Sequence, residues 1–226
     1  MALILNIHTA TGTAIVTLSQ DGKTIGVDTN RDQKEHAVFL HPSISKLLTS
    51  SGITPRHLEA ICVTEGPGSY TGIRVGLAAA KGLCFALDIP MVMLNTLYAM
   101  ALTAAREKPH PGAFYCPMID ARRMEVYMAL YDSELTEVIA SRAQILDSSF
   151  LTSITSGRKV FFSGDGCSKM RTFMKGGEEQ ILATDISPEV LSDISFLHFK
   201  QGKFSNIIYS KPLYLKEFYT PAKNND

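Results

Sequence analysis

The segment 66–76, Gly-Pro-Gly-Ser-Tyr-Thr-Gly-Ile-Arg-Val-Gly, has the composition of a site that could hold an anion. It joins a strand predicted over 60–64 to a helix predicted over 71–87. Backbone N–H groups in a glycine-rich turn, together with the positive end of a helix, can bind a phosphate or a carboxylate. The segment matches neither G-x-x-x-x-G-K-S/T nor G-x-G-x-x-G. The alternative is that its glycines set the turn geometry and allow close packing.

The predicted helix 71–87 carries small residues on one face. Gly72, Gly76, Ala79, Ala80 and Leu83 recur there at helical spacing. Because a glycine inside a helix costs about 0.5–1 kcal/mol relative to alanine, the pattern needs a compensating contact. It predicts that another backbone lies very close to this face, either in the same chain or on another subunit.

Other residues that could do chemistry lack partners at catalytic spacing. Ser69 is not part of a G-x-S-x-G turn, and we expect its hydroxyl to bond the backbone at the helix start. Asp120 with Glu125, and Asp165 between two glycines, have the positions of acids that stabilise turns. We therefore expect no catalytic residue among them.

The elements that must position these residues follow the same order in both halves of the chain. The first half is predicted to contain strands at 3–8, 14–19 and 24–28, a helix at 35–50, the strand 60–64, the helix 71–87, a strand at 91–94 and a helix at 96–106 capped by Asn95. After the Pro/Gly-rich segment 108–112 come strands at 114–119, 124–131 and 137–143, a helix at 148–155, a strand at 159–163 and a helix ending near 174. An aromatic tail at 207–219 is expected to pack back on the body, and 220–226 to fray.

This repeated unit of three strands and alternating helices and strands predicts a two-lobed α/β fold of the actin-like, sugar-kinase-like (ASKHA) class. The lobes are predicted at 1–107 and 108–226. In such folds, nucleotide phosphates lie between the lobes, at the turn after the first strand of each half. Those turns are 8–12 and 120–123 in this chain.

Both turns depart from a working nucleotide site. His8 stands where an aspartate would organise magnesium, and a neutral imidazole is a poor ligand for that ion. In the second turn, Arg122 and Arg123 are bulky where glycines would admit a phosphate. His8 as a general base remains open, although a histidine satisfied at a strand end is the favoured interpretation. The predicted degenerate nucleotide or anion site comprises His8, Thr9, Gly66, Gly68, Ser69, Asp120 and Arg122.

Composition limits the classes of function. The 226 residues include 22 Lys and Arg and 22 Asp and Glu, and this zero net charge argues against a large nucleic-acid footprint. Cys62, Cys84, Cys116 and Cys167 are far apart and mostly in apolar stretches, which predicts buried reduced thiols and a cytoplasmic protein. The N-terminus has no signal-peptide pattern, and polar residues and a proline interrupt the apolar stretch 83–105, so no membrane span is expected.

Three segments resemble the TsaB family, also called YeaZ. They are 66–83, 117–127 (Pro-Met-Ile-Asp-Ala-Arg-Arg-Met-Glu-Val-Tyr) and 212–216 (Pro-Leu-Tyr-Leu-Lys), and the element order matches over nearly the whole chain. The resemblance implies an actin-like fold. It also implies a bacterial subunit that supports synthesis of threonylcarbamoyladenosine next to the anticodon of tRNAs that read codons beginning with adenine.

The resemblance also implies that catalysis belongs to a partner. TsaD, the catalytic relative, carries an H-x-x-x-H metal pair, whose positions are Asn95 and Ala99 in this chain. His36 and His41 lie about 140° apart around their helix and cannot share an ion. We therefore expect no metal, and no cofactor beyond weak nucleotide binding at a subunit interface.

The implied role is a non-catalytic scaffold and activator of a TsaD-like catalytic subunit. A TsaE-like ATPase would complete the complex, tRNA would bind only through the complex, and the isolated chain would form a homodimer. The alternative is a stand-alone hydrolase of the glycoprotease type, or an ATP-dependent transferase that uses the cleft between the lobes.

The subunit interface is expected on the predicted helices 35–50 and 71–87. Apolar residues spread more than halfway around the first of these. The resemblance implies that the same helices serve self-association and TsaD binding, as mutually exclusive modes. The predicted interface residues are Val38, Ile44, Leu47, Leu48, Gly72, Gly76, Ala79, Ala80 and Leu83. On this interpretation, Gly76→Arg would give a folded monomer that no longer binds its partner.

Overall fold

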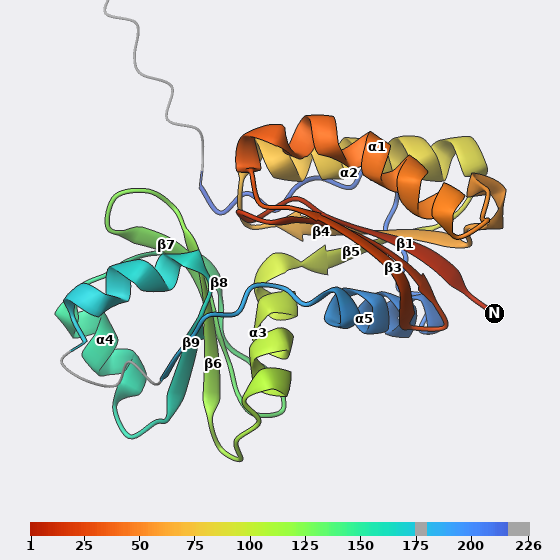
Figure 1. The fold of residues 1–226 in the computed structure, drawn as a ribbon. Coiled ribbons are helices and arrows are strands. Elements are labelled where there is room, and N and C mark those ends of the chain that lie inside the picture. The colour runs from red at the N-terminus through yellow and green to blue at the C-terminus, as the bar shows by residue number, and fades with distance from the viewer. Residues whose placement is uncertain (175–179, 217–226) are drawn as a thin grey trace, which may run out of the picture.

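The computed structural model describes residues 1–174 and 180–216, which form two lobes that each contain a five-stranded sheet (Figure 1). The first sheet has the strand order β3-β2-β1-β4-β5, and the second has β10-β9-β6-β7-β8. In each, the first strand of the lobe lies at the centre, antiparallel to its hairpin partner and parallel to the strand that follows the first helix. The predicted duplicated, actin-like α/β fold is confirmed.

The elements of the first lobe agree with the predicted ones to within a few residues. The strands are β1 (Leu3–His8), β2 (Ala14–Gln20), β3 (Lys23–Asn30), β4 (Ala60–Gly66) and β5 (Met91–Asn95). The helices are η1 (Gln33–Glu35), α1 (His36–Ser50), η2 (Pro55–His57), α2 (Tyr70–Leu87) and α3 (Thr96–Glu107). Asn95 caps α3, since its side chain accepts a hydrogen bond from the Tyr98 N–H at 3.1 Å.

The second lobe contains the elements between residues 114 and 182. Its strands are β6 (Phe114–Asp120), β7 (Glu125–Tyr131), β8 (Glu137–Ile145), β9 (Val160–Ser163) and β10 (Ile181–Leu182), with the helices α4 (Ser148–Thr155) and η3 (Asp165–Thr172). A further helix, α5 (Pro188–Lys200), follows in the chain. Helix α3 packs against this lobe, since Met100 and Ala104 belong to the same apolar cluster as Tyr115 and Phe161.

The alternation of β1 sends its side chains to two different layers. Leu3, Leu5 and Ile7 join the apolar cluster that α1 and α2 cover. Ile4 joins the cluster of α3 and α5 on the opposite face. Figure 1 shows α1 and α2 above the first sheet and α5 below it. The central strand is therefore buried on both faces, and its end is held between the lobes.

Helix α5, which was not predicted, returns from the second half of the chain to the first sheet. Its start is capped by Ser187, whose hydroxyl accepts from the Val190 N–H at 3.3 Å, and Pro188 occupies the first turn. Ser192 is fully buried and lies 2.7 Å from the Thr24 hydroxyl. Part of the range 108–226 thus completes the layer beneath the first sheet.

The tail after α5 runs along α2 toward the cleft. Lys81 donates from Nζ to the carbonyl oxygen of Ser210 at 2.7 Å, and the Leu213 N–H donates to the Glu65 oxygen at 2.8 Å. The predicted packing of the tail is thus seen for 207–216. The predicted segments 217–219 and 220–226 lie outside the described residues.

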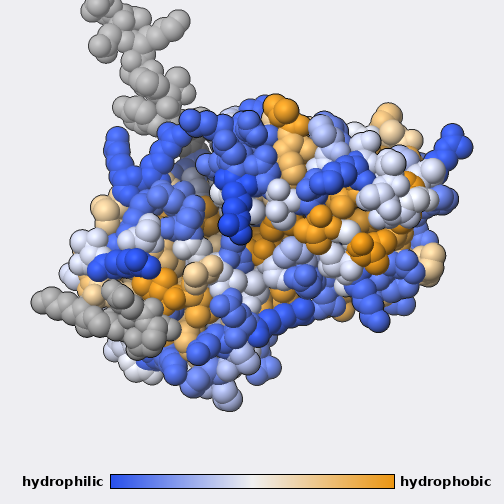
Figure 2. Space-filling view, viewed as in Figure 1, coloured by the Kyte–Doolittle hydropathy of each residue, from blue (hydrophilic) through white to orange (hydrophobic). Residues whose placement is uncertain are grey.

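The visible surface mixes hydrophilic and hydrophobic residues. Figure 2 shows a band of hydrophobic residues (orange) across the first lobe, between α1 and α5. The edge strand β3 exposes Ile25 and Val27. Over the described residues, no helix combines the length and apolar character needed to cross a bilayer.

Candidate functional site

A cleft of about 790 Å³ lies where the turns predicted from the two halves meet. Its first-lobe wall is formed by 10–12 and by the β4–α2 turn, and its second-lobe wall by the β6–β7 turn and Asp165. Residues 213–216 of the tail also line it. Gly68, Ser69, Asp120 and Arg122 of the predicted anion site face the cleft, while His8, Thr9 and Gly66 are buried.

His8 is satisfied by two threonines at the end of β1. Its Nδ1 lies 2.9 Å from the Thr64 hydroxyl and its Nε2 lies 2.8 Å from the Thr11 hydroxyl. Burial, reinforced by the charge of His36, lowers the pKa of His8 to about 3. A neutral ring engaged at both nitrogens cannot take a proton from a substrate without losing a hydrogen bond. Of the two interpretations of His8, the hydrogen-bonded one fits.

The same chain of contacts reaches Asp185, which the sequence did not single out. The Thr11 hydroxyl donates to Asp185 Oδ2 at 3.0 Å, and the Ile186 N–H donates to Oδ1 at 2.9 Å. Since Thr11 has one hydroxyl proton, the arrangement fits a His8 that carries its proton on Nε2. Burial raises the pKa of Asp185, although the bond from Thr11 opposes this. Asp185 lies in no recognisable motif, so no sequence signal could have found it.

The glycine-rich turn is closed by packing against the β1–β2 turn. The Ser69 N–H donates to the Ala10 carbonyl at 2.7 Å, and the Gly72 N–H donates to the Ser69 hydroxyl at 3.3 Å. A Cβ on Gly68 would lie 2.0 Å from the Ala10 oxygen. Ser69 bonds the backbone as predicted, and two of the amides that could cradle an anion, those of Ser69 and Gly72, are engaged inside the protein.

The small-residue face of α2 packs against β1 of the same chain. A Cβ on Gly72 would lie 2.0 Å from the Thr9 oxygen, and one on Gly76 would lie 2.5 Å from Thr9 Oγ1. The predicted close approach of a second backbone is therefore internal. Gly76→Arg would collide with β1, so it would disrupt the lobe rather than yield a folded monomer.

This packing corrects the placement of the predicted interface residues. Ile44, Leu47, Leu48, Gly72, Gly76, Ala79 and Ala80 are buried within the chain, and Leu83 is half-buried. Val38 differs, because 75% of it is exposed. The buried apolar residues of α1 thus fill the core beneath the helix, which leaves Val38, and part of Leu83, as the members of the set that can meet another molecule.

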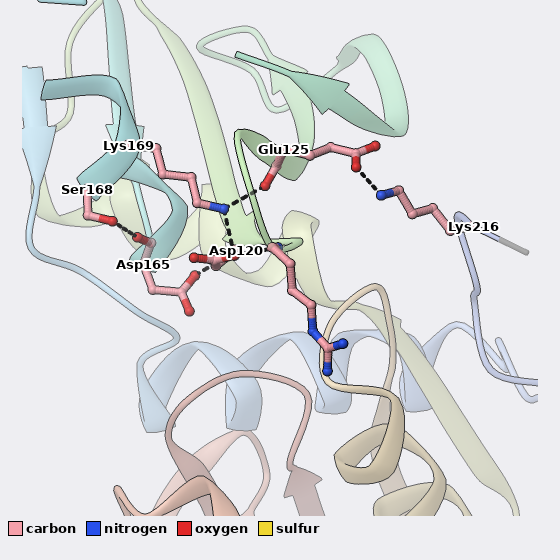
Figure 3. A network of polar contacts seen from close by, with 7 residues as sticks. Asp120, Glu125, Asp165, Ser168, Lys169 and Lys216 are labelled. Atoms are coloured by element: carbon pink, nitrogen blue, oxygen red, sulfur yellow. Dashed lines mark hydrogen bonds and ion pairs between the residues drawn. The ribbon is translucent and has the colours of Figure 1, made fainter. Parts of the chain in front are cut away.

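The turn of the second lobe is held by charged groups (Figure 3). Asp120 Oδ1 lies 2.6 Å from Lys169 Nζ and accepts the Arg122 N–H at 2.6 Å. Lys169 also donates to the Glu125 carbonyl oxygen at 2.8 Å. Lys216 of the tail pairs with the Glu125 carboxylate. Asp120 and Glu125 therefore stabilise the turn, as predicted, and do not form an acid–base pair.

Two acids of this turn have pKa values shifted in opposite directions. Burial raises the pKa of Asp120, but hydrogen bonds from Lys169 and the Arg122 N–H outweigh it, so the pKa lies below its usual value. Burial raises the pKa of Asp165, which accepts the Asp120 N–H at 2.8 Å. Asp165, the first residue of η3, thus holds the end of β6 through this hydrogen bond.

The residues of the two turns at the cleft do not fit the nucleotide and magnesium ion that an actin-like fold implies. His8 supplies no oxygen ligand, and the glycine-turn amides at Ser69 and Gly72 are engaged internally. Arg122 and Arg123 have φ values of 71° and 49°, so two long side chains occupy the turn where glycine would be unstrained. Among the described residues, no three His, Cys, Asp or Glu side chains lie together as a metal site would require.

The sequence profile of the family described as "TsaD: tRNA N6-adenosine threonylcarbamoyltransferase" matches residues 13–207. The chain belongs to the TsaD family. Within it, the resemblance to TsaB is confirmed by the Escherichia coli "tRNA threonylcarbamoyladenosine biosynthesis protein TsaB", 29% identical and aligned over 94% of each chain. The Bacillus subtilis TsaB is 35% identical over 57% of this chain and 54% of its own length.

Solved structures support the fold of this TsaD-family member. A Pseudomonas aeruginosa protein described as similar to peptidase YEAZ superposes with a TM-score of 0.80 at 24% identity, over 96% of this chain and all of the other. At the positions assigned to the TsaD histidine pair, Asn95 caps α3 and donates from Nδ2 to the Ser141 hydroxyl at 3.2 Å, and Ala99 is buried.

The four cysteines are buried free thiols, as predicted, and burial raises the pKa of each: Cys62, Cys84, Cys116 and Cys167.

Proposed function

We propose that this chain is a non-catalytic, cytoplasmic subunit that holds and activates a TsaD-like enzyme during synthesis of threonylcarbamoyladenosine in tRNAs that read codons beginning with adenine. A TsaE-like ATPase completes the complex, tRNA binds through the complex, and the isolated chain forms a homodimer. The proposal rests on the family and on the cleft. The observation that carries it is that His8, Asp120 and Asp165, the candidate catalytic groups of the two turns, are each hydrogen-bonded within the chain.

An exposed apolar surface supports a binding role. Phe85 on α2 is 83% exposed, and Ile208 and Tyr209 in the tail are 79% and 78% exposed. Lys81, one helical turn before Phe85, donates to the Ile208 carbonyl at 3.4 Å, which holds the tail beside this face of α2. We call Phe85, Ile208 and Tyr209 the α2–tail patch. This patch and Val38 on α1 are the proposed interface residues that can reach a partner. Phe85 was not indicated by the sequence.

Copurification with the TsaD-like protein of the same cell tests this role. The double variant Phe85→Ser with Tyr209→Ser removes two aromatic anchors, each of which can contribute about 2 kcal/mol or more to an interface. We expect at least a thirtyfold loss of affinity from about 2 kcal/mol. Ile145→Ser is the matched control, because Ile145 is 64% exposed on β8 in the other lobe. Failure of the unmodified chain to bind the TsaD-like protein would refute the proposal.

The isolated chain distinguishes the alternative function. We expect the purified protein to hydrolyse ATP no faster than a buffer control. Magnesium-dependent turnover that His8→Ala abolishes would instead favour the ATP-dependent transferase, and peptide hydrolysis above background would favour the glycoprotease-like hydrolase.

A further inference from the structure

A second cavity, of about 610 Å³, lies at the opposite ends of β6 and β9 from the cleft. Its lining includes Lys108, after α3, and Arg158 and Lys159, before β9. In Figure 1, this end of the second sheet points away from the first lobe. We call it the basic groove. The function proposed above uses none of its residues.

The three cations of the basic groove have no anionic partner within residues 1–174 and 180–216. The ion pairs of the described chain involve other lysines and arginines. The nearest acid in sequence, Glu107, is engaged by the hydroxyl of Thr184. Among the described residues, a chain with zero net charge thus places three positive charges without an ion-pair partner around one cavity.

Aromatic rings hold two of these cations in place. Arg158 Cζ lies 5.2 Å from the centre of the Phe114 ring, and Lys159 Nζ lies 5.5 Å from the centre of the Phe161 ring. Phe161 in turn stacks on Tyr115 at 5.8 Å between ring centres. A cation over a ring keeps its N–H donors available. The groove is thus a preorganised set of donors for an anion.

The Lys108 backbone is fixed by the same aromatic cluster. The Tyr115 hydroxyl donates to the Lys108 carbonyl oxygen at 2.8 Å, so the base of this side chain has a defined position beside the other two cations. Phe161 is only 2% exposed, so its ring cannot stack on a nucleobase. The chemistry of the groove is charge recognition. Arginine and lysine bind phosphate oxygens in this way without reading sequence.

We propose that the basic groove binds the phosphate backbone of the tRNA, an inference that rests on the function proposed above. The groove would contact RNA while the TsaD-like partner holds the nucleotide to be modified. Three cations form a small footprint, which is consistent with a neutral chain whose RNA affinity on its own is weak. Recognition is by backbone charge and shape, as is usual for paired regions of RNA.

Binding of a labelled tRNA transcript to the complex of this chain with its TsaD-like partner, measured by fluorescence anisotropy at several salt concentrations, tests the inference. The groove variant is Lys108→Gln, Arg158→Gln and Lys159→Gln. We expect about a tenfold or greater loss of affinity near 0.1 M salt, and a salt slope of the logarithmic binding constant that falls by about 2–3. The control variant Lys23→Gln, Arg56→Gln and Lys200→Gln removes three exposed cations elsewhere and should leave both values unchanged.

Two further variants distinguish the loss of contacts with phosphate from unfolding of the chain. Lys108→Gln alone, whose side chain lies over neither ring, should lower the slope by about 1. The charge-preserving triple Lys108→Arg, Arg158→Lys and Lys159→Arg should retain binding. Unchanged affinity and slope in the Gln triple, or an equal loss in the control triple, would overturn the inference. Displacement of tRNA by polyglutamate as effectively as by unlabelled RNA of equal charge would assign the groove to acidic polypeptides instead.

The readouts keep this inference separate from the role as a subunit. Copurification with the TsaD-like protein reports on the proposed function, and the groove variants should leave it unchanged. If no complex forms, tRNA binding by the isolated chain at low salt still tests the groove. Loss of that binding in the Gln triple but not in the control triple would support the groove alone.

Discussion

The turns after β1 and after β6 occupy equivalent places in two sheets of the same strand order, yet they are held by different forces. The first is held without an ion pair among the described residues: His8 lies between two threonines, Thr11 donates to Asp185, and the glycine turn packs on Ala10. The second is held by ion pairs and charge-assisted hydrogen bonds around Asp120 and Lys169. Duplication of a topology has therefore not duplicated its chemistry, since a site depends on the side chains placed on the fold.

The difference predicts how each turn responds to change. Contacts between backbones leave no room for an added atom, whereas charged side chains at a partly exposed turn lose only their own interactions. The first turn should therefore be sensitive to added volume and to protonation of its buried histidine, and the second to the loss of a charged side chain.

The largest effect is expected for Gly72→Ala at the first turn. Its Cβ would lie 2.0 Å from the Thr9 backbone oxygen, so β1 and α2 must separate. We expect the free energy of unfolding to fall by at least about 3 kcal/mol in urea denaturation. Gly82→Ala is the control in the same helix, since a Cβ there meets nothing within 4 Å, and it should gain about 0.5–1 kcal/mol. Equal stability of the Gly72 and Gly82 variants would show that the first turn is not sensitive to added volume.

The second prediction concerns pH and His8. The native pKa is about 3 and the unfolded value is 6.5, so below pH 6.5 the unfolded chain binds a proton that the native state does not. Stability should fall as pH drops from 6.5 toward 3, by about 1.6 kcal/mol between pH 6.5 and 5. His8→Asn should remove this contribution to the slope, whereas His41→Asn, at an exposed position, should keep it. The same dependence of stability on pH in both variants would contradict the assignment of this effect to His8.

The smallest effect is expected at the second turn, for Lys169→Met. The Lys169 side chain is 13% exposed and donates to both Asp120 and Glu125, so its loss should cost about 1.5–2 kcal/mol in thermal or urea unfolding. Lys46→Met breaks the Lys46–Asp28 pair, in which the lysine is 68% exposed, and should cost less than about 0.5 kcal/mol. A cost at Lys169 no greater than at Lys46 would mean that the charges do not hold this turn.

Most of the fold was predictable because local patterns and packing agree. The helix 71–87 was predicted from its glycine turn and periodicity, and Asn95 was predicted as the cap of α3. Helix α5 was missed although Ser187, Pro188 and Glu189 form a helix-start signal. Its buried face combines Val190, Leu191 and Ile194 with two serines, so polar residues interrupt the apolar stripe that reveals a helix in a sequence.

The position of the candidate site between the two turns was predictable, but its contacts were not. The two turns meet as expected, because the carboxyl ends of the central strands face one cleft. The spacing of Gly72 and Gly76 showed that a backbone lies close, but it could not show that this backbone is Thr9 of the same chain. Asp185 and Phe85 were missed because a half-buried polar partner and an exposed aromatic residue depend on tertiary placement, which no local pattern records.

The return of α5 to the first sheet has a consequence for synthesis on the ribosome. While residues 1–187 are being made, one face of β1 and β2, with Asn6 and Thr17, has no helix to cover it. The domain made first therefore cannot finish folding until nearly the whole polypeptide has emerged. Nascent chains should remain protease-sensitive in their first half until α5 leaves the exit tunnel, the reverse of the usual order in which N-terminal units fold first.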